Sequence, residues 1–258
     1  MAIRYKTCPK CGHTRSDNDP ANSDRCANCG IIYEKWLKQR FKSANHTTEH
    51  RESESRHRGR ELFDYLLYVN PATDSMVFYG RVLIYLIFFI WGWSFILMDI
   101  HWDSFNSSFM HVINLVFHEA GHVLFRPFGE FMTTLGGSLM QLIVPLVAML
   151  ALLIKNRDTF GATIGLWWLG QSMMDLAPYI NDARSLTMPL LGGGTGADRP
   201  GWHDWENILL DLGLIEQDHT IAVMVDGIGS ALMIFAFIWG ALLLKNRGQI
   251  TNKAKPCR

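Results

Sequence analysis

Apolar residues gather in four long runs, which cover residues 76–98, 131–154, 159–180 and 220–244. A helix needs about 20 mostly apolar residues to cross the hydrocarbon core of a bilayer, and each run is at least that long. Buried helices of a soluble protein are the alternative, but four such runs in a chain of 258 residues favour membrane spans. The pattern therefore predicts a mainly α protein, a polytopic membrane helix bundle.

Four of the five cysteines lie within the first 30 residues and form two CxxC pairs, Cys8 with Cys11 and Cys26 with Cys29. Two such pairs are typical of a tetrahedral four-cysteine site for structural zinc, whereas a redox dithiol needs only one pair. So small a module has too little core to fold alone, and bound metal would supply its folding energy. The segment resembles zinc ribbons, and it is expected to offer a surface to a cytosolic protein partner.

The composition divides the chain into four parts. We expect the zinc ribbon over residues 1–35, a basic tether and juxtamembrane segment over 36–75, the membrane domain over 76–245 and a cytosolic tail over 246–258. The tether has few apolar residues and is expected to be a solvated connector. The start of the chain, MAIRYKTCPK, lacks the apolar segment of a cleavable signal peptide, so none is expected.

Basic residues indicate the orientation of the membrane domain, because Lys and Arg are enriched in cytoplasmic loops. They cluster before the first run, between the second and third runs, and after the fourth run: Arg51, Arg56, Arg58 and Arg60; Lys155 and Arg157; Lys245, Arg247, Lys253 and Lys255. Four crossings put all three clusters on one side. We therefore expect an integral protein of a bacterial inner membrane with both termini in the cytoplasm. Because the formal net charge is zero, nucleic acid is not an expected partner.

The stretch FHEAGHVLF (117–125) places three polar residues in an apolar segment. His118 and His122 are four residues apart, so on a helix they project from one face and can share a metal ion. Glu119 lies beside them, where it can hold and deprotonate a water molecule. Ionisable groups are costly in apolar segments, which favours a functional site over a polar network that only packs helices. The charge pattern favours a short re-entrant helix over 109–126, entering from the outer side.

With HEAGH at 118–122 inside a multi-span apolar domain, the chain resembles integral-membrane zinc metallopeptidases, of which site-2 proteases are the best known. The resemblance implies that His118 and His122 are zinc ligands and that Glu119 is the catalytic base. Site-2 proteases take a third ligand, an aspartate, from a later membrane helix with an Asn-Pro and Asp-Gly type motif. This chain lacks that motif, and its nearest segment is QSMMDLAPYINDAR (171–184), so the resemblance is to a divergent relative.

A catalytic zinc usually has three protein ligands, so a third ligand is expected. The candidates near the expected outer side are Asp175, Asp182, His203, Asp204, Glu206 and Asp226. We favour Asp182 and His203, followed by Asp175, which could instead hydrogen-bond a ligand histidine. Asp204 is expected to cap an amphipathic helix, and Glu206 to face solvent. The glycine-rich segment 190–201 is predicted to form a flap over the site.

Together these features predict a membrane-embedded zinc metalloprotease, a metalloendopeptidase that hydrolyses peptide bonds of membrane or membrane-proximal substrates. The expected cofactors are one catalytic and one structural zinc ion, and the expected partners are the lipid bilayer and a protein or peptide substrate. A non-catalytic metal-binding scaffold or regulator and a metal transporter are the alternatives. A transporter should carry polar groups on both sides of the membrane midplane, whereas here they gather near one face, with Glu119 in the position of a base.

Overall fold

The computed structural model describes residues 5–16, 24–40, 59–70, 74–101 and 107–253, with side chains up to residue 246. The chain divides into two compact units, Met1–Tyr65 and Leu66–Arg258. The middle of the predicted tether, with Arg51, Arg56 and Arg58, lies outside the described residues, as does Lys255. The finer division into four parts stays a prediction.

The first unit contains two similar cysteine knuckles. In the first knuckle, the backbone N–H of Gly12 donates to the carbonyl of Cys8, and in the second, Gly30 donates to Cys26, both at 2.9 Å. Gly12 and Gly30 have φ angles of 73° and 71°, a left-handed conformation that suits glycine. An antiparallel bridge closes each knuckle, Thr7 with Thr14 and Arg25 with Ile32. A helix over 33–40 follows.

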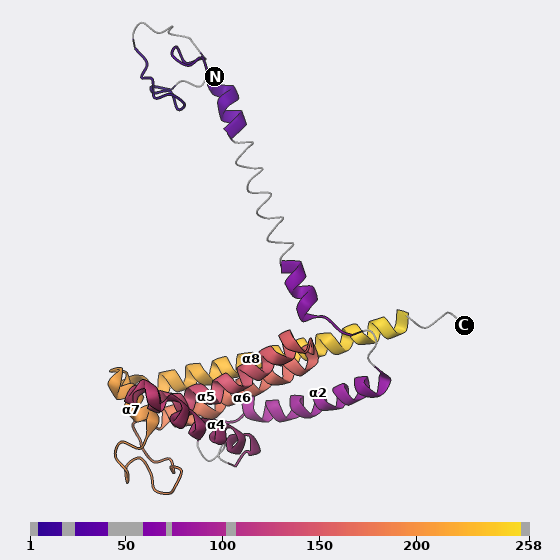
Figure 1. Cartoon of the computed structure of the whole chain (residues 1–258), viewed down its shortest axis with the longest axis vertical. Helices are drawn as coiled ribbons and strands as arrows, with labels where there is room; N and C mark the ends of the chain where they lie inside the picture. Colours follow the sequence, from indigo (N-terminus) through magenta and orange to yellow (C-terminus); the bar gives the residue numbers. More distant parts are fainter. Residues whose placement is uncertain (1–4, 17–23, 41–58, 71–73, 102–106, 254–258) are drawn as a thin grey trace, which may run out of the picture. The chain divides into compact units, whose positions relative to one another are not determined.

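The second unit is a helical bundle (Figure 1). Its named elements are α2 (Ser75–Ile96), α4 (Phe109–Phe125), η1 (Arg126–Phe128), α5 (Glu130–Leu150), η2 (Ala151–Lys155), α6 (Thr159–Asn181), α7 (Asp204–Asp211), η3 (Ile215–Gln217) and α8 (Asp218–Lys253). A helical segment over 59–66 precedes α2. The described residues contain no β-strand, only isolated bridges. The mainly α fold class is confirmed.

Helix α6 is the centre of the bundle. It packs along α8 and against α5, and most of its side chains are buried. Trp167 on α6 is 1% exposed and donates its indole N–H to the carbonyl of Phe88 on α2 at 3.1 Å. On the side of α8, Gly170 and Gly229 face each other so closely that a β-carbon on either would overlap the other's carbonyl oxygen. The polar groups that α6 carries are therefore enclosed by other helices.

Three helical segments among the described residues are long and apolar enough to cross a membrane: Ser75–Ile96, Glu130–Lys155 and Ile215–Asn246. They correspond to the first, second and fourth predicted spans. The third predicted span is α6, which has 23 residues, but its mean hydropathy is too low for it to count among these candidate spans. The reason is its position, since a helix surrounded by protein does not need an apolar surface toward lipid. Of the four predicted spans, three are therefore candidate membrane spans, and the remaining one, α6, is an inner helix of the bundle.

Helices α4 and α5 form a tight hairpin, joined by the short η1 segment. Their closest approach is at Gly121 and Gly136, where a β-carbon on Gly121 would overlap the carbonyl oxygen of Gly136. A β-carbon on Gly136 would in turn lie 2.6 Å from the β-carbon of Phe125. Only residues without side chains permit this contact between helix backbones. The hairpin places the HEAGH segment directly against the first half of α5.

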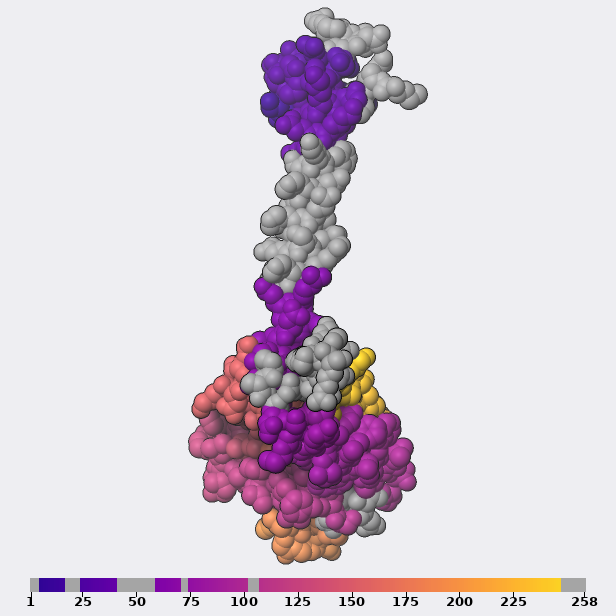
Figure 2. Space-filling model, turned by 90° about the vertical axis from the view of Figure 1, so that its right-hand side faces the viewer, coloured from indigo at the N-terminus to yellow at the C-terminus, as the bar shows by residue number. Residues whose placement is uncertain are grey.

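The loop between α6 and α7 lies at one end of the bundle, where it is drawn in orange (Figures 1 and 2). It contains an antiparallel bridge between Pro189 and Thr195. The Arg199 guanidinium donates to the carbonyl of Gly192 at 3.1 Å, and the Asp198 carboxylate accepts from the N–H and the hydroxyl of Thr195. These internal bonds give the loop a defined shape, and its first half reaches the site described next.

Candidate metal centre

The four cysteines of the first unit form a group whose sulfur atoms lie within 4.8 Å of one another. The Sγ atoms of Cys8 and Cys29, and those of Cys11 and Cys26, are 3.7 Å apart. Zinc–sulfur bonds of about 2.3 Å in a tetrahedron require sulfur atoms to be about 3.8 Å apart. The group therefore has the dimensions of a four-cysteine zinc site, with sulfur atoms of both knuckles in contact.

A second group of metal-ligand type brings together His118, His122 and Asp204, with their ligand atoms within 4.8 Å of one another. The Nε2 atom of His118 lies 3.0 Å from Asp204 Oδ2, and the Nε2 atom of His122 lies 3.2 Å from the same oxygen. His118 is buried, and His122 and Asp204 are partly buried. Two imidazoles from α4 and one carboxylate from α7 thus converge on one point.

The Nδ1 atom of each imidazole has a hydrogen-bond partner outside the group. His122 Nδ1 donates to the carbonyl of Thr133 at 2.8 Å, which fixes the proton on that nitrogen. His118 Nδ1 lies 3.1 Å from Gln141 Oε1, an acceptor. The orientation of the Gln141 amide follows from its nitrogen, which donates to Asp175 Oδ2 at 3.1 Å. In its neutral form, each imidazole would therefore present a lone pair, not a proton, at Nε2.

This arrangement favours positive charge at the three side chains. Burial alone would raise the pKa of Asp204, but the hydrogen bonds from His118 and His122 lower the pKa to about 2, so the group is a carboxylate at neutral pH. Two imidazole lone pairs and a carboxylate oxygen repel one another unless a positive charge lies among them. That charge is either a proton on each imidazole or one metal ion. Two nitrogens and one oxygen form a donor set that suits zinc.

Gly137 on α5 forms the floor of this group. A β-carbon at this position would lie 2.6 Å from the Nε2 atoms of both His118 and His122. Real side chains essentially never approach so closely, so a side chain here would displace the imidazoles or fill the space beside their lone pairs. The space that a metal ion would use exists because residue 137 is glycine.

Asp204 reaches the histidines because its neighbour caps the helix. His203 is the N-cap of α7, and its Nδ1 accepts the backbone N–H of Glu206 at 3.1 Å. Asp204, predicted to be the cap, is instead the first residue of α7 and points to α4. Its backbone N–H donates to the Tyr179 hydroxyl at 2.9 Å. The capping prediction for Asp204 was wrong, because an imidazole satisfies the helix end and leaves the carboxylate available.

Asp182 and His203, the favoured third-ligand candidates, are not in the group with the two histidines. They pair with each other, with His203 Nε2 at 3.4 Å from Asp182 Oδ2. Burial raises the pKa of the Asp182 carboxyl, but hydrogen bonds from His203, Ser185 and backbone N–H groups outweigh it and lower the pKa well below its usual range. This pair ties the end of α6 to the start of α7. Among the described residues, the side chain that joins His118 and His122 is therefore Asp204.

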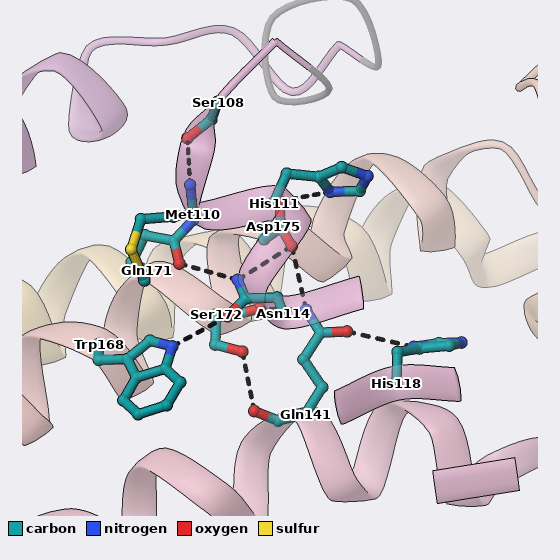
Figure 3. A network of polar contacts seen from close by, with 10 residues as sticks. All are labelled: Ser108, Met110, His111, Asn114, His118, Gln141, Trp168, Gln171, Ser172 and Asp175. Carbon is teal, nitrogen blue, oxygen red and sulfur yellow. Dashed lines mark hydrogen bonds and ion pairs between the residues drawn. The ribbon is translucent and has the colours of Figure 1, made fainter. Parts of the chain in front are cut away.

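Asp175, the next candidate, is the hub of a buried network around His118 (Figure 3). Its carboxylate lies 3.0 Å from His111 Nδ1 and accepts from Asn114 Nδ2 at 3.0 Å and from Gln141 Nε2 at 3.1 Å. Gln141 in turn contacts His118, so Asp175 acts on that histidine through the Gln141 amide. The alternative role predicted for Asp175, a direct hydrogen bond to His118 or His122, is not found: its carboxylate bonds His111 and reaches His118 only through Gln141.

The same network anchors α6 to α4 and α5. Asn114 also donates to Gln171 Oε1 at 2.9 Å and accepts from the indole N–H of Trp168 at 2.9 Å. The Ser172 hydroxyl donates to the carbonyl of Gln141 at 3.0 Å. Every bond in Figure 3 lies in a buried or partly buried position, where a fixed polar network holds its members in one geometry. His118 is thereby oriented by three helices.

Glu119 lines a cavity of about 880 Å³ that also contains the histidine–aspartate group. The walls come from α4, α5, α6 and the loop before α7, including Met188 to Gly192. Part of the predicted flap thus borders the site. Glu119 forms no hydrogen bond or salt bridge with the described residues. Among the remaining candidates, Glu206 lies on α7 with one buried oxygen, and Asp226 lies on α8 outside the group.

The sequence motif located α4 but missed three residues of the site. Gln141 and Gly137 lie four residues apart on α5, in a segment that reads as ordinary helix packing. Tyr179 lies on α6 near the cavity and bonds the backbone of Asp204. A glutamine in a predicted span was the only local signal, because a buried amide in an apolar helix needs a polar partner.

A catalytic role for Glu119 and metal binding by His118 and His122 remain predictions, while the grouping of the two histidines with an aspartate is a property of the fold. The described chain is a helical protein with three candidate membrane spans and an N-terminal group of four cysteines. Comparisons of the chain with protein-family models, with curated proteins and with solved structures found no match.

Proposed function

We propose that this protein is a membrane-embedded zinc metalloprotease that hydrolyses peptide bonds of membrane or membrane-proximal substrates. The observation that carries the proposal is the convergence of His118 Nε2, His122 Nε2 and Asp204 Oδ2 in a cavity that Glu119 also lines. Three ligands of this type leave a fourth position of a tetrahedral zinc site for water or substrate. A structural zinc site would have four protein ligands and no such cavity.

A zinc ion held by these three side chains would supply Lewis acidity, which polarises a carbonyl group and makes a water molecule more acidic. Glu119, which lines the same cavity, would act as the base that accepts a proton from water and would return a proton to the leaving amine. Asp175 and Gln141 keep the Nδ1 proton of His118 in place, so that Nε2 stays available. Thr133 does the same for His122.

The position of Glu119 favours a hydrolase over a metal-binding scaffold. A glutamate that served only to hold the bundle together would be expected to bond a neighbouring side chain. A transporter would need a polar path across the bundle, but the spans carry few buried charged groups beside this one site. For the N-terminal unit, we propose one structural zinc and a cytosolic protein partner, with the cavity of the membrane unit on the opposite side of a bacterial inner membrane.

The test compares the full-length wild type with Glu119→Gln, an amide of the same size that cannot accept the proton. Each protein is expressed in host cells, its zinc content is measured, and new protein N-termini in the membrane fraction are identified by mass spectrometry. We expect the variant to retain about two zinc ions per chain and to lose the new N-termini. The control is Glu130→Gln, at the exposed start of α5. Identical N-termini for wild type and Glu119→Gln would refute the protease.

A further inference from the structure

A second cavity, of about 850 Å³, lies between α2 and the helices α4 to α6, apart from the metal centre. We call it the α2 groove. Its α2 side extends from Val77 to Phe88, and its opposite side is mainly the first half of α6, with Phe160, Ile164 and Trp167. Almost all of its lining is apolar. Because α2 meets the criterion for a membrane span, this groove would be filled by a hydrophobic molecule in a bilayer.

The length of the α2 groove matches one leaflet. Val77 and Phe88 are separated by three helical turns, which correspond to about 16 Å along the helix axis. Half of the hydrocarbon core of a bilayer is about 15 Å thick. A groove that starts near one end of a span and stops near its middle suits an acyl chain, whereas a membrane-spanning helix of a partner protein would need a surface along the whole length.

The end of the α2 groove near Val77 carries charge. Arg81 and Asp158 both line the groove, and their Nη2 and Oδ1 atoms are 3.1 Å apart. Asp158 also caps α6 by accepting the N–H of Gly161, so its carboxylate is shared between two donors. A guanidinium group has five N–H donors, and the bond to Asp158 uses one of them. Lys155 and Arg157 precede Asp158 in the chain and add positive charge at this end.

From this combination of length, apolar lining and charge, we propose that the α2 groove is a binding site for one phospholipid. An acyl chain lies along α2 against α6, and the phosphate group lies at the remaining N–H donors of Arg81. Guanidinium groups bind phosphate oxygens by paired hydrogen bonds, which gives the head group a defined position. The bound lipid would fill the space between α2 and the inner helix. This site is independent of the metal centre and of the proposed protease activity.

Gly80 permits a clean test because it lines the groove and a β-carbon on it would meet nothing within 4 Å. The variant Gly80→Phe should fill the groove without disturbing the helix packing. Gly227→Phe on α8 is the matched control, since Gly227 also faces open space but lies outside the groove. Full-length proteins in detergent are mixed with 1-palmitoyl-2-oleoyl-phosphatidylglycerol, and bound lipid is counted by native mass spectrometry. We expect at least a tenfold loss of lipid affinity for Gly80→Phe and none for Gly227→Phe.

The head group is tested with Arg81→Gln, and with dioleoylglycerol, which has acyl chains but no phosphate. The wild type should prefer the phospholipid, and Arg81→Gln should bind both lipids alike. A photoreactive residue at Ile84 identifies the occupant in native membranes, where adducts with lipid are expected. Equal lipid binding by wild type and Gly80→Phe would overturn the proposal, as would equal loss in Gly227→Phe. An unchanged preference in Arg81→Gln, or adducts with protein alone, would overturn it as well.

Discussion

Gly137 and His118 lie so close together that a β-carbon on residue 137 would be 2.6 Å from the Nε2 atom of the histidine. The same β-carbon would be equally close to the Nε2 atom of His122. The two nitrogens therefore face a space that is kept open by a missing side chain on the neighbouring helix.

Gly137→Ala should abolish metal binding at the histidine–aspartate group while the four-cysteine site keeps its metal. The added methyl group occupies the space beside both Nε2 atoms, and moving α5 away from α4 to make room would break the close packing of Gly121 on Gly136. Total zinc should fall from about two ions per chain to about one, as measured by mass spectrometry of the metal. Gly227→Ala, at an open position on α8, is the control. Unchanged zinc in Gly137→Ala would show that the ion binds elsewhere.

Gln141→Leu should weaken metal binding without removing a ligand. Leucine has a similar volume, but it cannot accept the His118 Nδ1 proton, and it leaves Asp175 with one hydrogen bond fewer. Loss of a hydrogen-bond partner of a ligand histidine typically lowers metal affinity by about 10- to 100-fold. Competition with a chromophoric chelator measures this affinity. Gln141→Glu, which restores an acceptor, should recover part of the loss, and equal affinities for all three proteins would contradict the role assigned to Gln141.

His203→Ala should destabilise the bundle, and His203→Asn should restore much of the loss. Alanine removes the cap of α7 and leaves the buried carboxylate of Asp182 without its imidazole partner. Loss of a helix cap alone costs about 0.5–2 kcal/mol, and asparagine is among the best capping residues. Thermal unfolding of the full-length protein in detergent measures the effect. If His203 were a metal ligand instead, asparagine would lower the zinc content to the same extent as alanine.

The four-cysteine site should release zinc as the pH falls. The backbone N–H of Cys29 lowers the pKa of Cys26 to about 6, well below the usual value for a thiol. The thiolate of Cys26 is therefore present at neutral pH. Its contribution to zinc affinity is lost as the pH falls through about 6. Protons compete with zinc for all four sulfurs, so affinity should fall about 100-fold or more from pH 7.5 to 5.5. Chelator competition on the His118→Ala and His122→Ala double variant isolates this site, and a flat pH profile would argue against thiolate ligands.

Groups of residues that lie close together in the sequence could be predicted to meet in the structure. The cysteines of each pair and the histidines of HEAGH are three or four residues apart, so local backbone geometry alone decides whether they meet. The long apolar runs predicted the three candidate spans for the same kind of reason. Helix α6 was harder, because its apolar run is about as long as the other three, and the length of a run does not distinguish a lipid-facing helix from one enclosed by protein.

The choice between His203 and Asp204 shows why the rest could not be predicted. Both are adjacent polar residues at the start of one helix, and aspartate is the commoner cap. Which of them turns toward His118 depends on where α7 lies against α5 and α6, which the local sequence does not encode. Gln141 and Gly137 were missed for the same reason, since their roles arise only when α4 packs on α5.

The hairpin of α4 and α5 has a consequence for how the site is assembled. Both histidines, Thr133, Gly137 and Gln141 belong to this one contiguous segment, so two nitrogen donors and their supports can form early in synthesis. Asp204 follows much later in the chain, after α6, whose Asp175 accepts a hydrogen bond from Gln141. Two imidazoles alone would bind a cation weakly, and a third ligand would raise the affinity. Tight metal binding at this site would thus report that the C-terminal half has folded around the hairpin.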